Sequence, residues 1–159
     1  MKIARILFPT DFSDRSVAAL DYASNLAAWF SATLHIVYVD NLIDLVAKSP
    51  YSCPSFVTST DRSQVKAELE AIIPTIANVA CAHHFLEGGP AAEICAMVAK
   101  ERIDLIVMSS HGRTGLSRLL MGSVAECVLR NAACPVLIVK QPSTEPSGTT
   151  KDVAACIPA

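Results

Sequence analysis

The chain has 159 residues, of which 52% are hydrophobic and 18% are charged, and its 13 basic and 15 acidic side chains give a net charge of −2. A chain of this length buries about 68–70% of the surface that its unfolded form exposes, so one globular domain can fold without a disulfide or a structural metal. The balanced charge lacks the basic excess typical of nucleic-acid-binding proteins. No apolar run approaches the roughly 20 residues of a membrane span, and none fits a secretory signal. We therefore expect a cytoplasmic protein that binds neither nucleic acid nor membrane.

Short β-branched runs alternate along the chain with stretches of helical periodicity. The runs predict strands at residues 3–8, 33–39, 79–86, 104–108 and 136–139. Helical spacing predicts four helices: one capped by Ser13 and reaching Phe30, one over 61–76, one starting at Pro90, and one over 123–131. This alternation is typical of an α/β domain in which helices cover both faces of a parallel sheet.

Two segments carry weak structural signals. Residues 40–57 contain two prolines and little periodicity, which predicts a short helical turn inside a long connection. Residues 141–152 are polar and hold almost no apolar side chain, so they cannot offset the entropy lost on ordering. The sequence therefore predicts a single domain over 1–140, followed by a flexible tail over 141–159.

The cysteines and histidines of the predicted strands do not make a clear metal site. Six cysteines occur without a C-x-x-C pair, and we interpret them as reduced, small, buried side chains. Cys81 and His83 share one face of a strand, whereas His84 points to the opposite face. His35, which alternates with apolar neighbours, is expected to be a hydrogen-bonded core residue, and we expect no metal ligand among these side chains.

Loops that follow strands are the expected ligand sites of an open α/β sheet. The loops over 9–13 and 109–123 stand out. In the second, glycines allow a close backbone approach, Gly122 and Ser123 open a helix whose free amides favour an anion, and Arg113 adds positive charge. These ingredients predict a phosphate site. Two alternatives remain open: Ser123 and Glu126 fit a capping box that marks any helix start, and the arginines fit a solvated surface.

The same loop carries a family resemblance that extends over residues 1–140. Residues 104–140, DLIVMSSHGRTGLSRLLMGSVAECVLRNAACPVLIVK, resemble the C-terminal signature of the universal stress proteins, and residues 6–13, ILFPTDFS, resemble their N-terminal strand and loop. Nucleotide-binding members carry a glycine, two residues, a glycine, nine residues, a glycine, and then serine or threonine. Gly112, Gly122 and Ser123 match this pattern, and Ser109 replaces the first glycine.

The resemblance implies a doubly wound, Rossmann-like, five-stranded parallel sheet of order 3-2-1-4-5 that binds ATP or a related adenine nucleotide. Asp11 and Val39 are then expected near the adenosine, which is lined by Pro9, Thr10 and Met108. The phosphates are expected at Gly112, Gly122, Ser123 and Val124, with Ser109 and Arg113 beside them. The function implied is that of a stress-response sensor or regulator that acts on a protein partner still to be identified.

Turnover of the nucleotide is not expected to be substantial. Neither a Gly-Lys-Ser/Thr phosphate loop nor a G-x-G-x-x-G motif occurs, and Asp11 is the one candidate carboxylate able to reach a magnesium ion. A triad of Ser109, His111 and Asp11 lacks the strained G-x-S-x-G elbow of hydrolases. We therefore predict nucleotide binding with slow or no hydrolysis and no catalytic residue or resident metal.

Two alternatives to the sensor function remain. Ser109 could close the pocket and leave a dimeric interaction module without nucleotide, or the protein could be a slow ATPase or phosphotransferase. The last predicted strand, Val136–Val139, is apolar and lies at a sheet edge, which favours pairing with a second copy. The resemblance implies a homodimer through the same strand.

Overall fold

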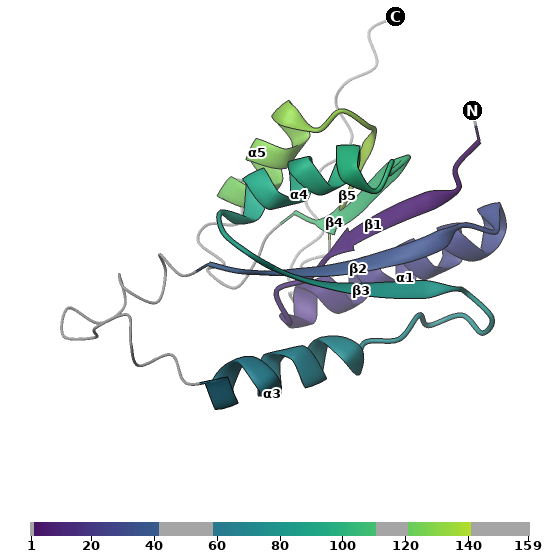
Figure 1. The fold of residues 1–159 in the computed structure, drawn as a ribbon. Coiled ribbons are helices and arrows are strands. Elements are labelled where there is room, and N and C mark those ends of the chain that lie inside the picture. The colour runs from purple at the N-terminus through teal and green to yellow at the C-terminus, as the bar shows by residue number, and fades with distance from the viewer. Residues whose placement is uncertain (1, 42–58, 111–120, 141–159) are drawn as a thin grey trace, which may run out of the picture.

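The computed structural model describes residues 2–41, 59–110 and 121–140 (Figure 1). Strands and helices alternate through these ranges. In the order of the chain they are β1 (Arg5–Pro9), α1 (Asp14–Phe30), β2 (Thr33–Asp40), α3 (Ser59–Glu70), β3 (Cys81–Glu87), α4 (Pro90–Lys100), β4 (Leu105–Ser109), α5 (Ser123–Asn131) and β5 (Val136–Val139).

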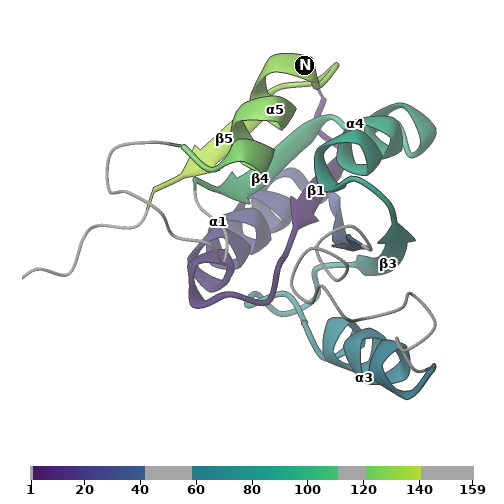
Figure 2. The ribbon, with the colours of Figure 1, turned by 90° about the vertical axis from the view of Figure 1, so that its left-hand side faces the viewer.

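The five strands form one parallel sheet of order β3-β2-β1-β4-β5. β1 is the central strand: Leu7 lies opposite His35 of β2 on one side and opposite Ile106 of β4 on the other. Helices α1 and α3 cover one face of the sheet, and α4 and α5 cover the other (Figures 1 and 2). The predicted α/β class and the predicted strand order are confirmed.

Two hydrophobic cores fill the spaces between the sheet and its helices. Ile6 and Phe8 of β1 point into the core beneath α1, while Leu7 between them points into the core beneath α4 and α5. All three side chains are at most 1% exposed. A central parallel strand buried on both faces needs a continuous apolar run, which explains the sequence Ile6-Leu7-Phe8.

Helix α3 is shorter than predicted. The apolar spacing predicted a helix over 61–76, but α3 ends at Glu70. Pro74 accounts for this end, because proline cannot donate to the carbonyl of the residue four positions before it, and its ring collides with that carbonyl. That carbonyl belongs to Glu70. The helix over 123–131 and the strand over 136–139, in contrast, are confirmed at both ends.

The prediction that the cysteines are buried is wrong for those in the described ranges. Cys81 and Cys127 are exposed, Cys95 and Cys134 are partly buried, and all four carry free thiols. Burial of neighbouring aliphatic side chains already fills the two cores, so the thiols lie at their margins. Cys53 and Cys156 lie outside the described residues, as do the connection predicted over 42–57 and the predicted tail over 141–159.

Within the described ranges, no helix has both the length and the apolar character that a membrane crossing requires.

Candidate functional site

The carboxyl ends of β1, β2 and β4 lie side by side at one edge of the sheet, where the chain winds outward in opposite directions from β1 and β4. The start of α5 is joined to this edge by hydrogen bonds. The Gly122 N–H donates to the Ser110 carbonyl at 2.9 Å, and the Ser110 N–H donates to the Val139 carbonyl at 3.1 Å. The described parts of the two loops singled out in the sequence, residues 9–13 on one and residues 109–110 and 121–123 on the other, therefore lie at the edge where open α/β sheets bind ligands.

The loop between β1 and α1 is ordered around the Asp11 carboxylate. Asp11 Oδ1 accepts hydrogen bonds from the Ser13 N–H at 3.1 Å and from the Ser13 hydroxyl at 2.6 Å. Ser13 is the N-cap of α1 as predicted, but its side chain donates to Asp11 instead of capping the helix. The position of the Asp11 carboxylate is thus fixed before any ligand is bound.

The Thr10 side chain supports this loop on the side of the sheet that α1 covers. Its N–H donates to the Val37 carbonyl at 2.9 Å, and its hydroxyl accepts from the Phe12 N–H at 3.1 Å. The same hydroxyl lies 3.2 Å from the hydroxyl of Ser16 on α1, and the Thr10 side chain is buried. The Thr10 side chain therefore orders the loop from the side of α1.

Phe12 adopts a left-handed backbone conformation, with φ at 60°, that few residues other than glycine and asparagine adopt. Its ring stacks on the Tyr38 ring with a centroid distance of 4.6 Å, and Tyr38 in turn contacts Phe85 at 5.9 Å. The ring stacking holds the strained residue in place. Sequence reasoning missed Phe12 and Tyr38, although aromatic residues at the ends of two neighbouring predicted strands were a usable signal.

Val39 and Met108, which are predicted beside the adenosine, and Val124, which is predicted at the phosphates, lie on the α4 and α5 side of the sheet. Met108 is 6% exposed and belongs to the core beneath α4 and α5, and Val39 and Val124 pack against that same core. They come from the ends of β4 and β2 and from the start of α5. The three side chains thus share one face at the edge where the strands end.

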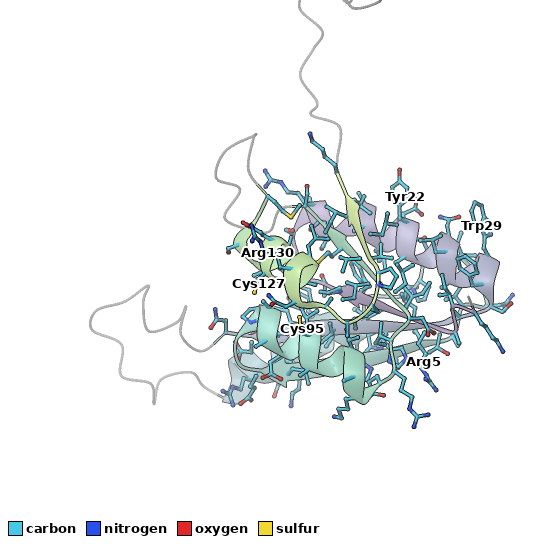
Figure 3. The ribbon with its side chains drawn as sticks, turned by 90° about the horizontal axis from the view of Figure 1, so that it is seen from above. Arg5, Tyr22, Trp29, Cys95, Cys127 and Arg130 are labelled. Atoms are coloured by element: carbon cyan, nitrogen blue, oxygen red, sulfur yellow. The ribbon has the colours of Figure 1, made fainter. Side chains whose placement is uncertain are left out.

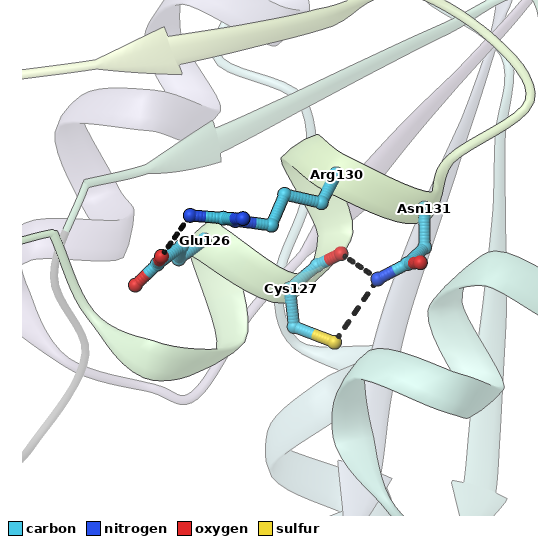
Figure 4. Close-up of polar contacts among 4 residues, drawn as sticks. All are labelled: Glu126, Cys127, Arg130 and Asn131. Carbon is cyan, nitrogen blue, oxygen red and sulfur yellow. Dashed lines mark hydrogen bonds and ion pairs between the residues drawn. The ribbon is translucent and has the colours of Figure 1, made fainter.

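The start of α5 differs from the predicted capping box. Gly122 is the N-cap, so the third helical residue is Ala125 and not Glu126, and the Glu126 carboxylate pairs instead with Arg130 at 2.9 Å (Figure 4). The predicted capping box is wrong for this reason. The amides of Ser123, Val124 and Ala125 have no acceptor inside the helix, because the first helical turn offers none.

Ser109 ends β4 opposite Val139 and is partly buried. Pro9 ends β1 opposite Val37 and is also partly buried. Two further predicted site residues, Gly112 and Arg113, lie outside the described residues, as does His111 of the alternative triad.

An ion pair and a cation–ring contact join α3 to the ends of β2 and β3. Arg62 lies 3.0 Å from the Glu87 carboxylate and 3.9 Å from that of Asp40, and Lys66 Nζ lies 5.0 Å from the centre of the Phe85 ring. Sequence reasoning did not anticipate these contacts, which depend on how α3 packs on the sheet.

A hollow of about 170 Å³ opens on the α1 and α3 side of the sheet. It is mainly apolar, and its lining residues are Phe8, Thr10, Phe12, Ser16, Val17, Leu20, Glu68 and Ile72. The sheet separates it from the core against which Val39, Met108 and Val124 pack. It is therefore not part of the site built from those residues.

The histidines of the strands make structural contacts. His35 Nδ1 and His84 Nε2 share a hydrogen bond at 3.1 Å and their rings stack, while His83 Nε2 lies 2.7 Å from the Ile72 carbonyl oxygen. The expectation of a hydrogen-bonded, buried His35 is confirmed. In the part of the chain that the structure describes, no group of three His, Cys, Asp or Glu side chains could hold a metal ion.

Folding stability is expected to fall as the medium becomes acidic through pH 6.5. Burial lowers the pKa of His35, and the neighbouring His84 adds to this effect; burial also lowers the pKa of His84, with Glu101 opposing it. As the pH falls, the unfolded chain therefore takes up protons at a higher pH than the folded chain does. Folding stability begins to fall when the pH reaches the unfolded pKa of about 6.5, and it continues to fall below that pH.

Urea unfolding at about pH 7.5 and about pH 5.5 measures this effect. The unfolding midpoint should be lower at the acidic pH, and His84→Gln, whose amide can still bond to His35, should reduce the difference. A midpoint difference that is equal in the two proteins would contradict the role of the histidine pair.

Comparison with known proteins identifies close relatives of the whole described region. Residues 2–140 match the universal stress protein family. Universal stress protein MJ0531 of Methanocaldococcus jannaschii is 37% identical over 143 residues, which cover 89% of this chain and 84% of the relative. Universal stress protein A homolog 1 of Coxiella burnetii is 33% identical over 141 residues, which cover 87% of this chain and 97% of the relative.

Solved structures share the fold. The structure of MJ0577 from Methanocaldococcus jannaschii superposes with a TM-score of 0.78 at 25% identity, covering 91% of this chain and 100% of that one. A universal stress protein in complex with cAMP has a TM-score of 0.57 at 23% identity, and one from Archaeoglobus fulgidus in complex with dAMP has 0.63 at 21%. Each of these two alignments covers 87% of this chain and 98% of the other.

Proposed function

We propose that this chain, which belongs to the universal stress protein family, binds ATP or a related adenine nucleotide at the carboxyl ends of β1, β2 and β4 and acts as a stress-response sensor or regulator. Two features at the edge where the strands end support the proposal: the Asp11 carboxylate after β1, which Ser13 orders, and the open first turn of α5, whose N-cap bonds to the residue after β4. Two members of the same fold have been solved with adenine nucleotides, cAMP and dAMP, which supports this choice of ligand.

The adenosine would lie between the loop after β1 and the apolar residues of β2 and β4. Asp11 has oxygen lone pairs suited to the hydroxyl donors of a ribose or the amino group of an adenine. Val39 and Met108 would contact the flat base, and the ends of β1 at Pro9 and Thr10 would border it. Thr10 contributes through the order that its buried hydroxyl gives to the loop.

The phosphates would lie at the start of α5. The free amides of Ser123 and Val124 and the positive end of the helix dipole favour an anion there. Gly122 directs its own amide to the Ser110 carbonyl, so its contribution is the absence of a side chain in front of the helix. Gly112 would complete the phosphate contacts as the family pattern implies, with Ser109 and Arg113 beside the phosphates.

A magnesium ion would accompany ATP as a partner of the phosphates, and Asp11 is the carboxylate that we propose to reach it. The ion would neutralise phosphate charge. Asp11 already accepts two hydrogen bonds from Ser13, which leaves it poorly suited to activate a water molecule. We therefore propose binding with slow or no hydrolysis.

We further propose that residues 1–140 form one domain that dimerises through β5. In the described residues β5 pairs with β4 alone, and Leu137 on this edge strand is 38% exposed. An uncovered apolar edge favours pairing with an identical strand. The dimer would present nucleotide occupancy to a protein partner that remains to be identified. Sedimentation at varied concentration tests the dimer, and a persistent monomer would exclude this role for β5.

A second candidate function is that of a dimeric interaction module without nucleotide. It is favoured by Ser109, which adds a side chain at a position where the family's nucleotide-binding pattern has none, and by the inward direction of the Gly122 amide. Acid extraction of the purified protein separates the two candidates. Adenine nucleotide in the extract supports the sensor, whereas an empty extract and no heat on titration with Mg-ATP support the module.

Replacing Ser109 with glycine should tighten nucleotide binding, because it removes a hydroxymethyl group from the end of β4 beside the proposed phosphates. Relief of a modest steric contact corresponds to about 1 kcal/mol, or roughly a fivefold gain in affinity. Equilibrium dialysis with ATP measures the change. Equal affinities for the two proteins would show that the site does not depend on this position.

A further inference from the structure

Helices α4 and α5 are neighbours that run in the same direction. Each follows the carboxyl end of a parallel strand and returns along the sheet, and both pack on the same core (Figures 1 and 3). Cys95 is the sixth residue of α4, and Cys127 is the fifth residue of α5. Because the helices are parallel and start from the same edge of the sheet, the two thiols lie at similar heights on adjacent helices.

The two thiols differ in their exposure. Cys127 is exposed, and its Sγ accepts a hydrogen bond at 3.4 Å from Asn131 Nδ2, on the side of α5 toward α4 (Figure 4). Cys95 is partly buried against the core shared by the helices. Burial raises the pKa of the Cys95 thiol, and the nearby Cys127 adds to this effect. The Cys95 thiol therefore keeps its proton, whereas the exposed Cys127 thiol can be reached by reagents in solution.

We propose that Cys95 and Cys127 form a reversible disulfide that joins α4 to α5 when the protein is exposed to hydrogen peroxide. The Cys127 sulfur attacks the peroxide, the O–O bond breaks, and water leaves, which produces a sulfenic acid on Cys127. The Cys95 sulfur then attacks the Cys127 sulfur, the S–O bond breaks, and hydroxide departs as water with the Cys95 proton. In total, two thiols are oxidised, and one hydrogen peroxide is reduced to two waters.

The exposure of Cys127 supports its assignment as the first sulfur to react, because a peroxide reaches it more readily than it reaches the partly buried Cys95. The disulfide has to bring the two β-carbons to about 3.5–4.5 Å, so any movement that closes this distance brings α5 toward α4. α5 is a helix of nine residues joined to the sheet at Gly122, so such a movement would reach the first turn of α5. An effect on nucleotide affinity rests on the proposed function, whereas the disulfide itself does not.

Peptide mapping of the full chain after treatment with hydrogen peroxide tests the disulfide without any nucleotide. Combined cleavage after Glu, Lys and Arg puts Cys95 in the peptide 94–100, Cys127 in 127–130 and Cys134 in 131–140. The expected results are a linked pair of 94–100 with 127–130, the loss of two free thiols per chain, and recovery of both on adding dithiothreitol. Cys95→Ser and Cys127→Ser should each abolish the linked pair, and the matched control Cys134→Ser should retain it.

A linked pair that contains Cys134 in place of Cys127, a disulfide between two chains, or a number of free thiols that the peroxide leaves unchanged would overturn the proposal. A second measurement compares ATP affinity before and after oxidation. If the disulfide forms and the reduced protein binds no ATP, the proposed function fails while the disulfide stands. If the reduced protein binds ATP and no disulfide forms, the disulfide proposal fails while the proposed function stands.

Discussion

Replacing Gly122 with valine is expected to lower the affinity for ATP by about a hundredfold or more, which corresponds to about 2.8 kcal/mol. Gly122 has φ at −61° and ψ at 144°, a conformation that any residue adopts, so the backbone alone does not require glycine here. The reason for the loss is steric. A branched side chain would stand in front of the Ser123 and Val124 amides and exclude the phosphates from them.

Gly89 supplies a matched control for this variant. It is the N-cap of α4, with φ at −76° and ψ at 118°, and a β-carbon added there meets no atom within 4 Å. Gly89→Val and Gly122→Val should each cost about 0.5–1 kcal/mol of stability through the weaker N-cap. Only Gly122→Val should weaken ATP binding in equilibrium dialysis. Equal affinities for both variants would contradict a phosphate site at the start of α5.

Replacing Asp11 with alanine is expected to weaken ATP binding by roughly tenfold to a hundredfold. A hydrogen bond to a charged group contributes about 1.5–3 kcal/mol, and the variant removes the acceptor proposed for the adenosine. It also removes the two bonds that Asp11 accepts from Ser13, at a cost of about 1 kcal/mol in folding stability. Titration calorimetry and urea unfolding measure the two effects separately.

Ser13→Ala distinguishes a contact with the ligand from an effect on loop order. It removes the 2.6 Å bond from the Ser13 hydroxyl while leaving the bond from the backbone amide and the Asp11 carboxylate in place. Its stability should fall by about 1 kcal/mol through the lost hydrogen bond to Asp11, and its ATP affinity by less than about threefold. If Ser13→Ala weakens binding as much as Asp11→Ala, Asp11 acts by ordering the loop.

The sheet could be predicted from the sequence because its signals are local. The continuous run Ile6-Leu7-Phe8 is buried on both faces, as a central parallel strand requires, and Cys134-Pro135 ends one element just before β5 begins. The end of α3 was missed because the apolar spacing continued past Glu70, while the effect of Pro74 on the carbonyl four residues earlier decided the boundary.

The site was less predictable, because its order comes from contacts between distant segments. The Gly122 amide bonds to Ser110, and this bond made Gly122 the N-cap and displaced the capping box expected at Ser123 and Glu126. The stacking of Phe12 on Tyr38 likewise joins the loop after β1 to strand β2, across 26 residues of the sequence. The ligand contacts of the predicted site residues stay predictions, and Gly112 and Arg113 among them lie outside the described residues.

Titration of the purified chain, freed of any bound nucleotide, with Mg-ATP tests the central claim most directly. The claim is that a carboxylate after β1 and the open turn of α5 together hold an adenine nucleotide. Saturable heat with one ATP per chain, competed by AMP and absent from Gly122→Val, is the predicted result. If the unmodified chain gives no saturable heat, although it and both glycine variants are equally folded, the result would contradict the claim.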